Sequence, residues 1–166
     1  MNIALIGMPA SGKTFVGKPL AARLGYTFID PDKVMESELG KPLQGVLEEL
    51  GDEAFLKKEW DTTRIATRGR DRCVISTGGS IVLTEEAMDY LADIAFIVYI
   101  KVPLDILEDR MGSTPRGTVG ADSKSLSQIY AERTPLYEQW ANVVIESEDN
   151  QENVLEKVLA VLPALT

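Results

Sequence analysis

The sequence of 166 residues contains no histidine and only one cysteine. A metal site built from histidine and cysteine is therefore excluded, and so is an internal disulfide. Without histidine, acid–base chemistry has to rest on carboxylates, lysine, tyrosine or Cys73. Cys73 stands beside Val74 and Ile75, so we expect it to be a small side chain buried in a strand.

Long apolar runs and an excess of positive charge are also absent. No stretch approaches the roughly 18–20 apolar residues of a membrane span, and no charged, apolar leader precedes the first predicted strand. The net charge of −9 argues against nucleic acid and anionic membranes as partners, because both are negatively charged. The sequence has no heptad repeat of the kind that forms a coiled coil. We therefore expect a cytoplasmic monomer with a small-molecule partner.

Short apolar runs alternate with segments of helical periodicity along the whole chain. We predict strands at 3–6, 26–29, 73–76, 94–100 and 143–145. We predict helices at about 13–24, 33–50 with a break at 40–42, 52–69, 84–91, 103–110, 125–141 and 151–162. This alternation predicts a single α/β domain in which helices cover both faces of a parallel sheet.

The most specific motif is GMPASGKT, at residues 7–14 between the first predicted strand and helix. It fits the pattern G-x-x-x-x-G-K-T, whose backbone N–H groups and helix N-terminus bind phosphate oxygens. Gly7 and Gly12 permit the tight turn. Lys13 supplies a charge to the terminal phosphates, and the Thr14 hydroxyl can bind Mg²⁺. The motif predicts a nucleoside triphosphate site.

Two carboxylates, Asp30 and Asp32, follow the second predicted strand. Residues two positions apart at a strand end project to the same side. Taken alone, a helix cap by Asp32 with Asp30 in a turn is an equally good interpretation. With Mg²⁺ and a nucleotide at Thr14, one carboxylate can instead hold a metal-bound water while the other faces the hydroxyl of an acceptor.

Residues 111–120 are rich in glycine, serine, threonine and proline and contain one arginine, Arg116. A plain surface connection is the commoner role of such a loop, but beside a phosphate site we favour a mobile lid. Arg116 is then the candidate to close on the transferring phosphoryl group, where developing charge favours a mobile cation.

These motifs resemble the shikimate kinase family. Besides the phosphate loop, the D-x-D segment and the lid arginine, the resemblance includes STGG at 76–79, Arg110 before the lid and RTPLY at 133–137. It implies a three-layer P-loop NTPase fold with a five-stranded parallel sheet. The whole chain, 1–166, would be one kinase domain with acceptor-binding helices at about 33–69 and a lid at about 111–124. The implied reaction transfers the γ-phosphoryl group of ATP, with Mg²⁺, to a hydroxyl of shikimate.

The resemblance also implies roles for individual residues. Arg110 would lie against adenine, Asp32 would orient or deprotonate the acceptor hydroxyl, and Arg133 would bind the acceptor carboxylate. The implied catalytic residues are Lys13, Asp32 and Arg116. The implied nucleotide site is Gly7, Ala10, Ser11, Gly12, Lys13, Thr14, Phe15 and Arg110, with the metal held by Thr14 and, through water, Asp30. The implied acceptor site is Asp32, Leu56, Gly78, Gly79, Ser80 and Arg133.

Two positions depart from the family pattern. Leu56 replaces the arginine of Phe-Arg-x-x-Glu, and Ser80 replaces the third of three glycines. Both belong to the implied acceptor pocket, so a kinase for another small polyol or sugar acid is the alternative. A nucleotide-binding regulatory module without transfer activity is a second alternative, against which Asp32 and Arg116 argue. No Asn-Lys-x-Asp element of a guanine-nucleotide switch occurs.

Overall fold

The computed structural model describes residues 1–112, 117–148 and 151–163. Their centre is a five-stranded sheet in the order β2-β3-β1-β4-β5, with every neighbouring pair parallel. The strands are β1 (Asn2–Ile6), β2 (Thr27–Ile29), β3 (Cys73–Ser76), β4 (Ala95–Lys101) and β5 (Val143–Glu146). The prediction of a five-stranded parallel sheet is confirmed.

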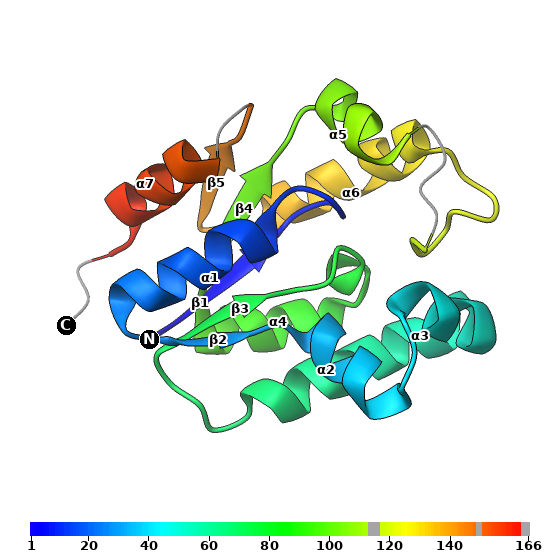
Figure 1. Ribbon diagram of the computed structural model, residues 1–166, viewed down its shortest axis with the longest axis horizontal. Helices are drawn as coiled ribbons and strands as arrows, with labels where there is room; N and C mark the ends of the chain where they lie inside the picture. The colour runs from blue at the N-terminus through cyan, green and yellow to red at the C-terminus, as the bar shows by residue number, and fades with distance from the viewer. Residues whose placement is uncertain (113–116, 149–150, 164–166) are drawn as a thin grey trace.

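Helices cover both faces of the sheet, as predicted (Figure 1). Helices α1 and α7 pack together on one face, while α4 and α6 pack against β4 from the other. A separate pair, α2 and α3, lies beside the sheet. The helices are α1 (Lys13–Leu24), α2 (Pro31–Leu39), α3 (Leu43–Thr67), α4 (Glu85–Ile94), α5 (Leu104–Met111), α6 (Leu126–Trp140) and α7 (Gln151–Val161), with a 3₁₀ turn η1 (Ile81–Leu83). No helix among the described residues has the length and apolar character to span a membrane.

Local chemistry explains where the helix boundaries differ from prediction. Helix α2 begins at Pro31 instead of 33, because proline suits the first helical position and Asp30 caps it by accepting from the Lys33 N–H at 3.2 Å. The helices predicted to end at 50 and to begin at 52 form one helix, α3, with a kink at Gly51 (φ 76°, ψ 169°). The short η1 turn was not predicted.

The main core is built on the central strand β1, all five residues of which are buried. A second, smaller cluster joins α2 and α3 to the later part of the predicted lid: Met35, Val46, Phe55 and Val119. Since parallel strands end at one edge, the loops after β1, β2 and β3 meet there. The backbone N–H and hydroxyl of Thr77 both donate to the Leu5 carbonyl, at 3.2 and 2.9 Å, and fix the loop after β3 to the end of β1.

Candidate active site

The loop after β1 has the backbone of a phosphate cradle. Gly7 and Gly12 have positive φ angles of 148° and 87°, and Gly12 forms the cap of α1. A Cβ on Gly7 would lie 2.6 Å from the Ile100 carbonyl oxygen, so that position has to be glycine. Ala10 also has a positive φ, 62°, a conformation that costs energy for a residue with a side chain. The loop therefore holds its shape through backbone conformation.

Lys13 lies folded over this loop and is 7% exposed. Its Nζ donates to the carbonyl oxygens of Gly7 and Met8, both at 2.8 Å, and to Ser11 Oγ at 3.3 Å. Burial lowers the pKa of Lys13 to about 8, although Asp32 and Asp30 partly oppose the effect. The ammonium is thus held at the loop by oxygens that a phosphate group could replace.

Three oxygen-bearing side chains meet beside the loop. The Thr14 hydroxyl donates to Asp30 Oδ2 at 3.3 Å and lies 3.3 Å from Ser76 Oγ. They come from α1 and from the ends of β2 and β3, so three separate elements build the cluster. The described residues contain no cluster of three or more acidic, cysteine or histidine side chains that could hold a metal. The cluster beside the loop offers one carboxylate and two hydroxyl groups.

The other predicted nucleotide residues lie at the rim. Arg110 reaches from α5 and donates to the Ala10 carbonyl at 2.8 Å, so it contacts the loop backbone. The Phe15 ring is 69% exposed on the first turn of α1 and borders the cavity described next. Arg116, predicted to close with the lid, lies outside the described residues.

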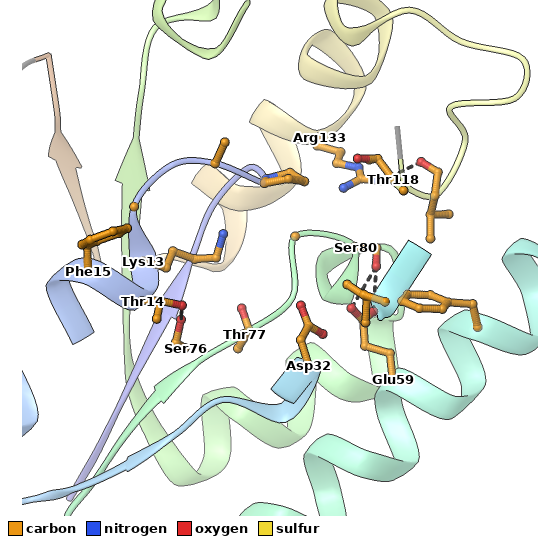
Figure 2. Close-up of a pocket in the computed structure, with 18 residues that line it drawn as sticks. Lys13, Thr14, Phe15, Asp32, Glu59, Ser76, Thr77, Ser80, Thr118 and Arg133 are labelled. Carbon is orange, nitrogen blue, oxygen red and sulfur yellow. Dashed lines mark hydrogen bonds between the residues drawn. The ribbon is translucent and has the colours of Figure 1, made fainter. Parts of the chain in front are cut away.

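A cavity of about 310 Å³ opens next to the phosphate loop. Figure 2 shows Lys13, Asp32 and Arg133 pointing into the same space from different elements. Asp32 comes from α2 and Arg133 from α6. Residues 117–119, from the far end of the predicted lid, complete the wall. The predicted catalytic carboxylate and the predicted acceptor-binding arginine therefore share one cavity with the phosphate-loop lysine.

Both residues leave one buried polar atom without a partner among the described residues: Asp32 Oδ1 and Arg133 Nη1. Arg133 is only 1% exposed, and its other terminal nitrogen donates to the Val119 carbonyl at 2.9 Å. Burial, with Asp30 nearby, raises the pKa of Asp32 to about 6. An unpaired acceptor and an unpaired donor in one cavity are the pattern expected of groups that a ligand satisfies.

Glu59 is a third ionisable residue in the cavity wall, and the site prediction had left it out. It is 1% exposed on α3, and the Ser80 hydroxyl lies 2.9 Å from each of its carboxyl oxygens (Figure 2). Burial, followed by the charge of Asp32, raises the pKa of Glu59 to about 8. A signal was available, because a glutamate placed between buried residues of a helix has to find a polar partner.

The glycines after β3 allow these groups to come close. A Cβ on Gly78 would contact Glu59 Oε2 and lie 2.8 Å from Asp32 Oδ1, so both carboxyl groups face it. A Cβ on Gly79 would lie 2.6 Å from the Pro9 side chain, and the Gly79 carbonyl accepts from the Tyr137 hydroxyl at 2.5 Å. The glycine loop thus touches the phosphate loop on one side and the two carboxyl groups on the other.

Leu56 does not lie where it was expected. The residues of α3 that border the cavity are Leu43, Phe55 and Glu59, whereas half-buried Leu56 packs against the small cluster around Met35 and Val46. An aliphatic side chain is better accommodated in that cluster than beside buried carboxyl groups. Sequence reasoning also did not assign roles to cavity residues Pro9, Leu43, Phe55, Ser76, Thr77, Thr118 and Val119.

The parallel sheet, the phosphate loop at its central strand and the acceptor-like cavity beside it define a P-loop phosphotransferase. The comparisons with known proteins specify this class further. The family model for shikimate kinase matches residues 9–163. A shikimate kinase of Nitratidesulfovibrio vulgaris is 32% identical over 97% of this chain and 95% of its own, and one of Clostridium botulinum is 34% identical over 96% and 95%.

Solved structures agree with these matches. A shikimate kinase from Acinetobacter baumannii, in complex with shikimate, has a TM-score of 0.86 at 27% identity over 96% of this chain and 91% of its own. A gluconokinase from Sinorhizobium meliloti shares the fold, with a TM-score of 0.61 at 20% identity over 96% and 89%. The chain belongs to the shikimate kinase family. It is accordingly an ATP-dependent phosphotransferase with a small-molecule acceptor.

Proposed function

We propose that this protein transfers the γ-phosphoryl group of ATP to a hydroxyl of shikimate. The observation that carries the proposal is the pair of unpaired buried atoms in the cavity, Asp32 Oδ1 and Arg133 Nη1. The first suits a hydroxyl that donates a hydrogen bond, and the second suits a carboxylate. Shikimate offers both groups, and a family member of known structure binds it.

In the proposed reaction Asp32 accepts a hydrogen bond from the acceptor hydroxyl and orients its oxygen toward the γ-phosphorus, or removes its proton. Lys13 exchanges its loop carbonyl partners for phosphate oxygens and stabilises the charge that develops there. Arg133 holds the acceptor carboxylate, and Arg116 would close over the γ-phosphate with the lid. Positioning and charge stabilisation supply the catalysis.

The oxygen cluster of Thr14, Asp30 and Ser76 suits Mg²⁺, because hard oxygen donors are the ligands this ion prefers. With the nucleotide bound, Thr14 would bind the metal directly and Asp30 through water. The ion would neutralise phosphate charge. Chelation of Mg²⁺ should therefore abolish turnover, and its addition should restore it.

A kinase for another hydroxylated acid is the second candidate, favoured by Leu56 and Ser80 in place of the family's residues. A panel of acceptors that includes shikimate, quinate and gluconate, assayed by ADP release, separates the two. Shikimate should give the highest kcat/KM. Turnover of another acid with shikimate inert would overturn the proposal. A reaction without any acceptor is the control for ATP hydrolysis.

A further inference from the structure

Glu59 is the one ionisable residue of the described cavity wall that the proposed reaction leaves without a task. It is almost fully buried, yet no ion pair to it occurs among the described residues, where its hydrogen-bond partner is Ser80. Leu56, one helical turn earlier on α3, is aliphatic and packs, half-buried, against the small cluster around Met35 and Val46. A buried carboxylate normally has a cationic partner, so the solitary serine requires an explanation.

The charged groups that face Glu59 come from three other elements. Asp32 on α2 is its nearest acidic neighbour, since both carboxyl groups lie against Gly78. Lys13 on α1 is turned toward the loop carbonyls, and Arg133 on α6 donates to Val119. Among the described residues neither cation is hydrogen-bonded or ion-paired to Glu59. Both still act to lower the pKa of Glu59, but burial and the charge of Asp32 raise it by more. Together with burial, these surroundings favour the neutral carboxyl.

The charge balance of the cavity depends on this one proton. If Glu59 is ionised, Arg133 faces two carboxylates, Asp32 and Glu59, while Lys13 serves the phosphates. An anionic acceptor that binds Arg133 would then be repelled by the second carboxylate. If Glu59 is neutral, one guanidinium and one carboxylate remain, and each has an unpaired atom for a different group of the acceptor. An anion would therefore bind better to the neutral form.

We propose that Ser80 and Glu59 form a positioning pair that couples acceptor binding to a proton: an anionic acceptor binds with full affinity only while the Glu59 carboxyl is protonated. The inference rests on the proposed function, since it concerns the shikimate carboxylate. Where Glu59 is ionised in the free enzyme, binding takes one proton from solvent onto a Glu59 oxygen. Ser80 is a positioning residue, since its hydroxyl holds both carboxyl oxygens in place.

The test is the pH dependence of the KM for shikimate between pH 6.5 and 9.5, at saturating ATP and Mg²⁺. With the pKa of Glu59 raised to about 8, the KM should be flat at low pH and should rise by about thirtyfold between pH 7 and 9.5. Saturating ATP matters because the pKa of Lys13 is also lowered to about 8, and phosphate oxygens keep this ammonium charged. The KM for ATP is measured separately to exclude a contribution from Lys13.

Three variants separate the pair from its surroundings. Glu59→Gln, which has no proton to gain, should abolish the rise in KM. Glu53→Gln removes an exposed glutamate from the same helix and should retain the rise. Ser80→Ala should move the rise to higher pH, because the lost hydrogen bond favours the charged carboxyl. Calorimetry at pH 8.5 in two buffers of different ionisation enthalpy should detect proton uptake on shikimate binding to the wild type and none with Glu59→Gln.

The outcomes are distinguishable. Shikimate turnover with a KM that stays flat to pH 9.5, or a rise that persists in Glu59→Gln, would overturn the coupling and leave the proposed function standing. Proton uptake that is equal in wild type and Glu59→Gln would do the same. If the KM of Ser80→Ala begins to rise at the same pH as that of the wild type, Ser80 does not belong to the pair. If shikimate is inert at every pH, the proposed function fails and this inference fails with it.

Discussion

The two halves of the active site are built by different means. On the nucleotide side the groups that face the ligand are largely backbone atoms of one continuous loop, and its lysine is fully hydrogen-bonded within that loop. On the acceptor side, side chains from α2, α3, α6 and the glycine loop converge, and two of them keep an unpaired atom. Phosphate recognition therefore depends on the backbone of one contiguous loop. Acceptor recognition depends on side chains from several elements, so it can change by substitution at single positions.

Lys13→Ala tests the nucleotide side and should have the largest effect. We expect kcat/KM to fall roughly 10³-fold, because the ammonium acts on charge that develops in the transition state. Steady-state kinetics measure the loss, and Lys18→Ala, an exposed lysine of the same helix, is the matched control. Turnover within a few-fold of wild type would mean that the loop geometry alone suffices.

Asp32→Asn tests whether the two sides are separable. The amide cannot take the hydroxyl proton, so we expect kcat to fall by about 10²–10³-fold while the Kd for ATP stays near the wild-type value. Calorimetry with ATP and steady-state kinetics give the two numbers, with Asp89→Asn on α4 as the control. A weakened ATP affinity with kcat intact would place Asp32 on the nucleotide side instead.

Leu56→Arg tests how far acceptor recognition can change at one position. An arginine one turn before Glu59 can pair with that carboxyl and add a charge-assisted contact to the acceptor carboxylate. We expect the KM for shikimate to fall about ten- to a hundredfold, with the KM for ATP unchanged. Ile65→Arg, which adds the same charge at an exposed site of α3, is the control.

An unchanged or higher KM in Leu56→Arg would show that the acceptor carboxylate does not approach this turn of α3. Since Leu56 also packs against the small cluster, the thermal stability of the variant has to be recorded alongside. A folded variant that has lost all shikimate turnover would instead indicate an acceptor with an apolar group where the new guanidinium enters the cavity.

Glu59→Gln tests the acceptor side through the stability of the fold. The pKa of Glu59 is raised in the folded protein, so between pH 5 and 8 the folded state binds more protons than the unfolded state, and stability falls as pH rises. The variant should lose this dependence. The free energy of unfolding of Glu59→Gln minus that of the wild type should therefore increase with pH, by at most about 1.4 kcal/mol per pH unit over that range.

Urea unfolding at pH 5, 6, 7 and 8 gives this difference directly. Glu53→Gln should run parallel to the wild type, because that side chain is exposed. A constant difference between Glu59→Gln and wild type across these pH values would mean that Glu59 is already ionised in the folded protein. It would also remove the physical basis for proton-coupled acceptor binding.

The same contrast explains what the sequence alone could predict. The phosphate loop is contiguous and its residue types are demanded by backbone conformation, so Gly7, Gly12 and Lys13 could be placed directly. The strands were predicted because buried parallel strands are short apolar runs. The cap of α2 was assigned to Asp32 in one interpretation and is Asp30, because the proline between them starts the helix.

The acceptor side of the cavity could not be predicted in full, because it depends on contacts between segments that are distant in the sequence. Nothing near Glu59 in the sequence indicates that Ser80, 21 residues later, lies against it. Leu56 was expected at the cavity because the family pattern has a functional residue there. The apolar replacement follows the nearest hydrophobic cluster instead. Roles for Arg133 and Asp32 came from resemblance, and the structure adds that both have an unpaired atom.

The contact between Gly79 and Pro9 has a consequence for how such enzymes diversify. Because this glycine lies directly against Pro9, any larger residue at position 79 would push the phosphate loop and the glycine loop apart. Mutations that leave this glycine in place, such as one at position 80, can therefore accumulate during evolution without separating the two loops. One ancestral scaffold can in this way give rise to kinases for different acids while its chemistry is inherited unchanged.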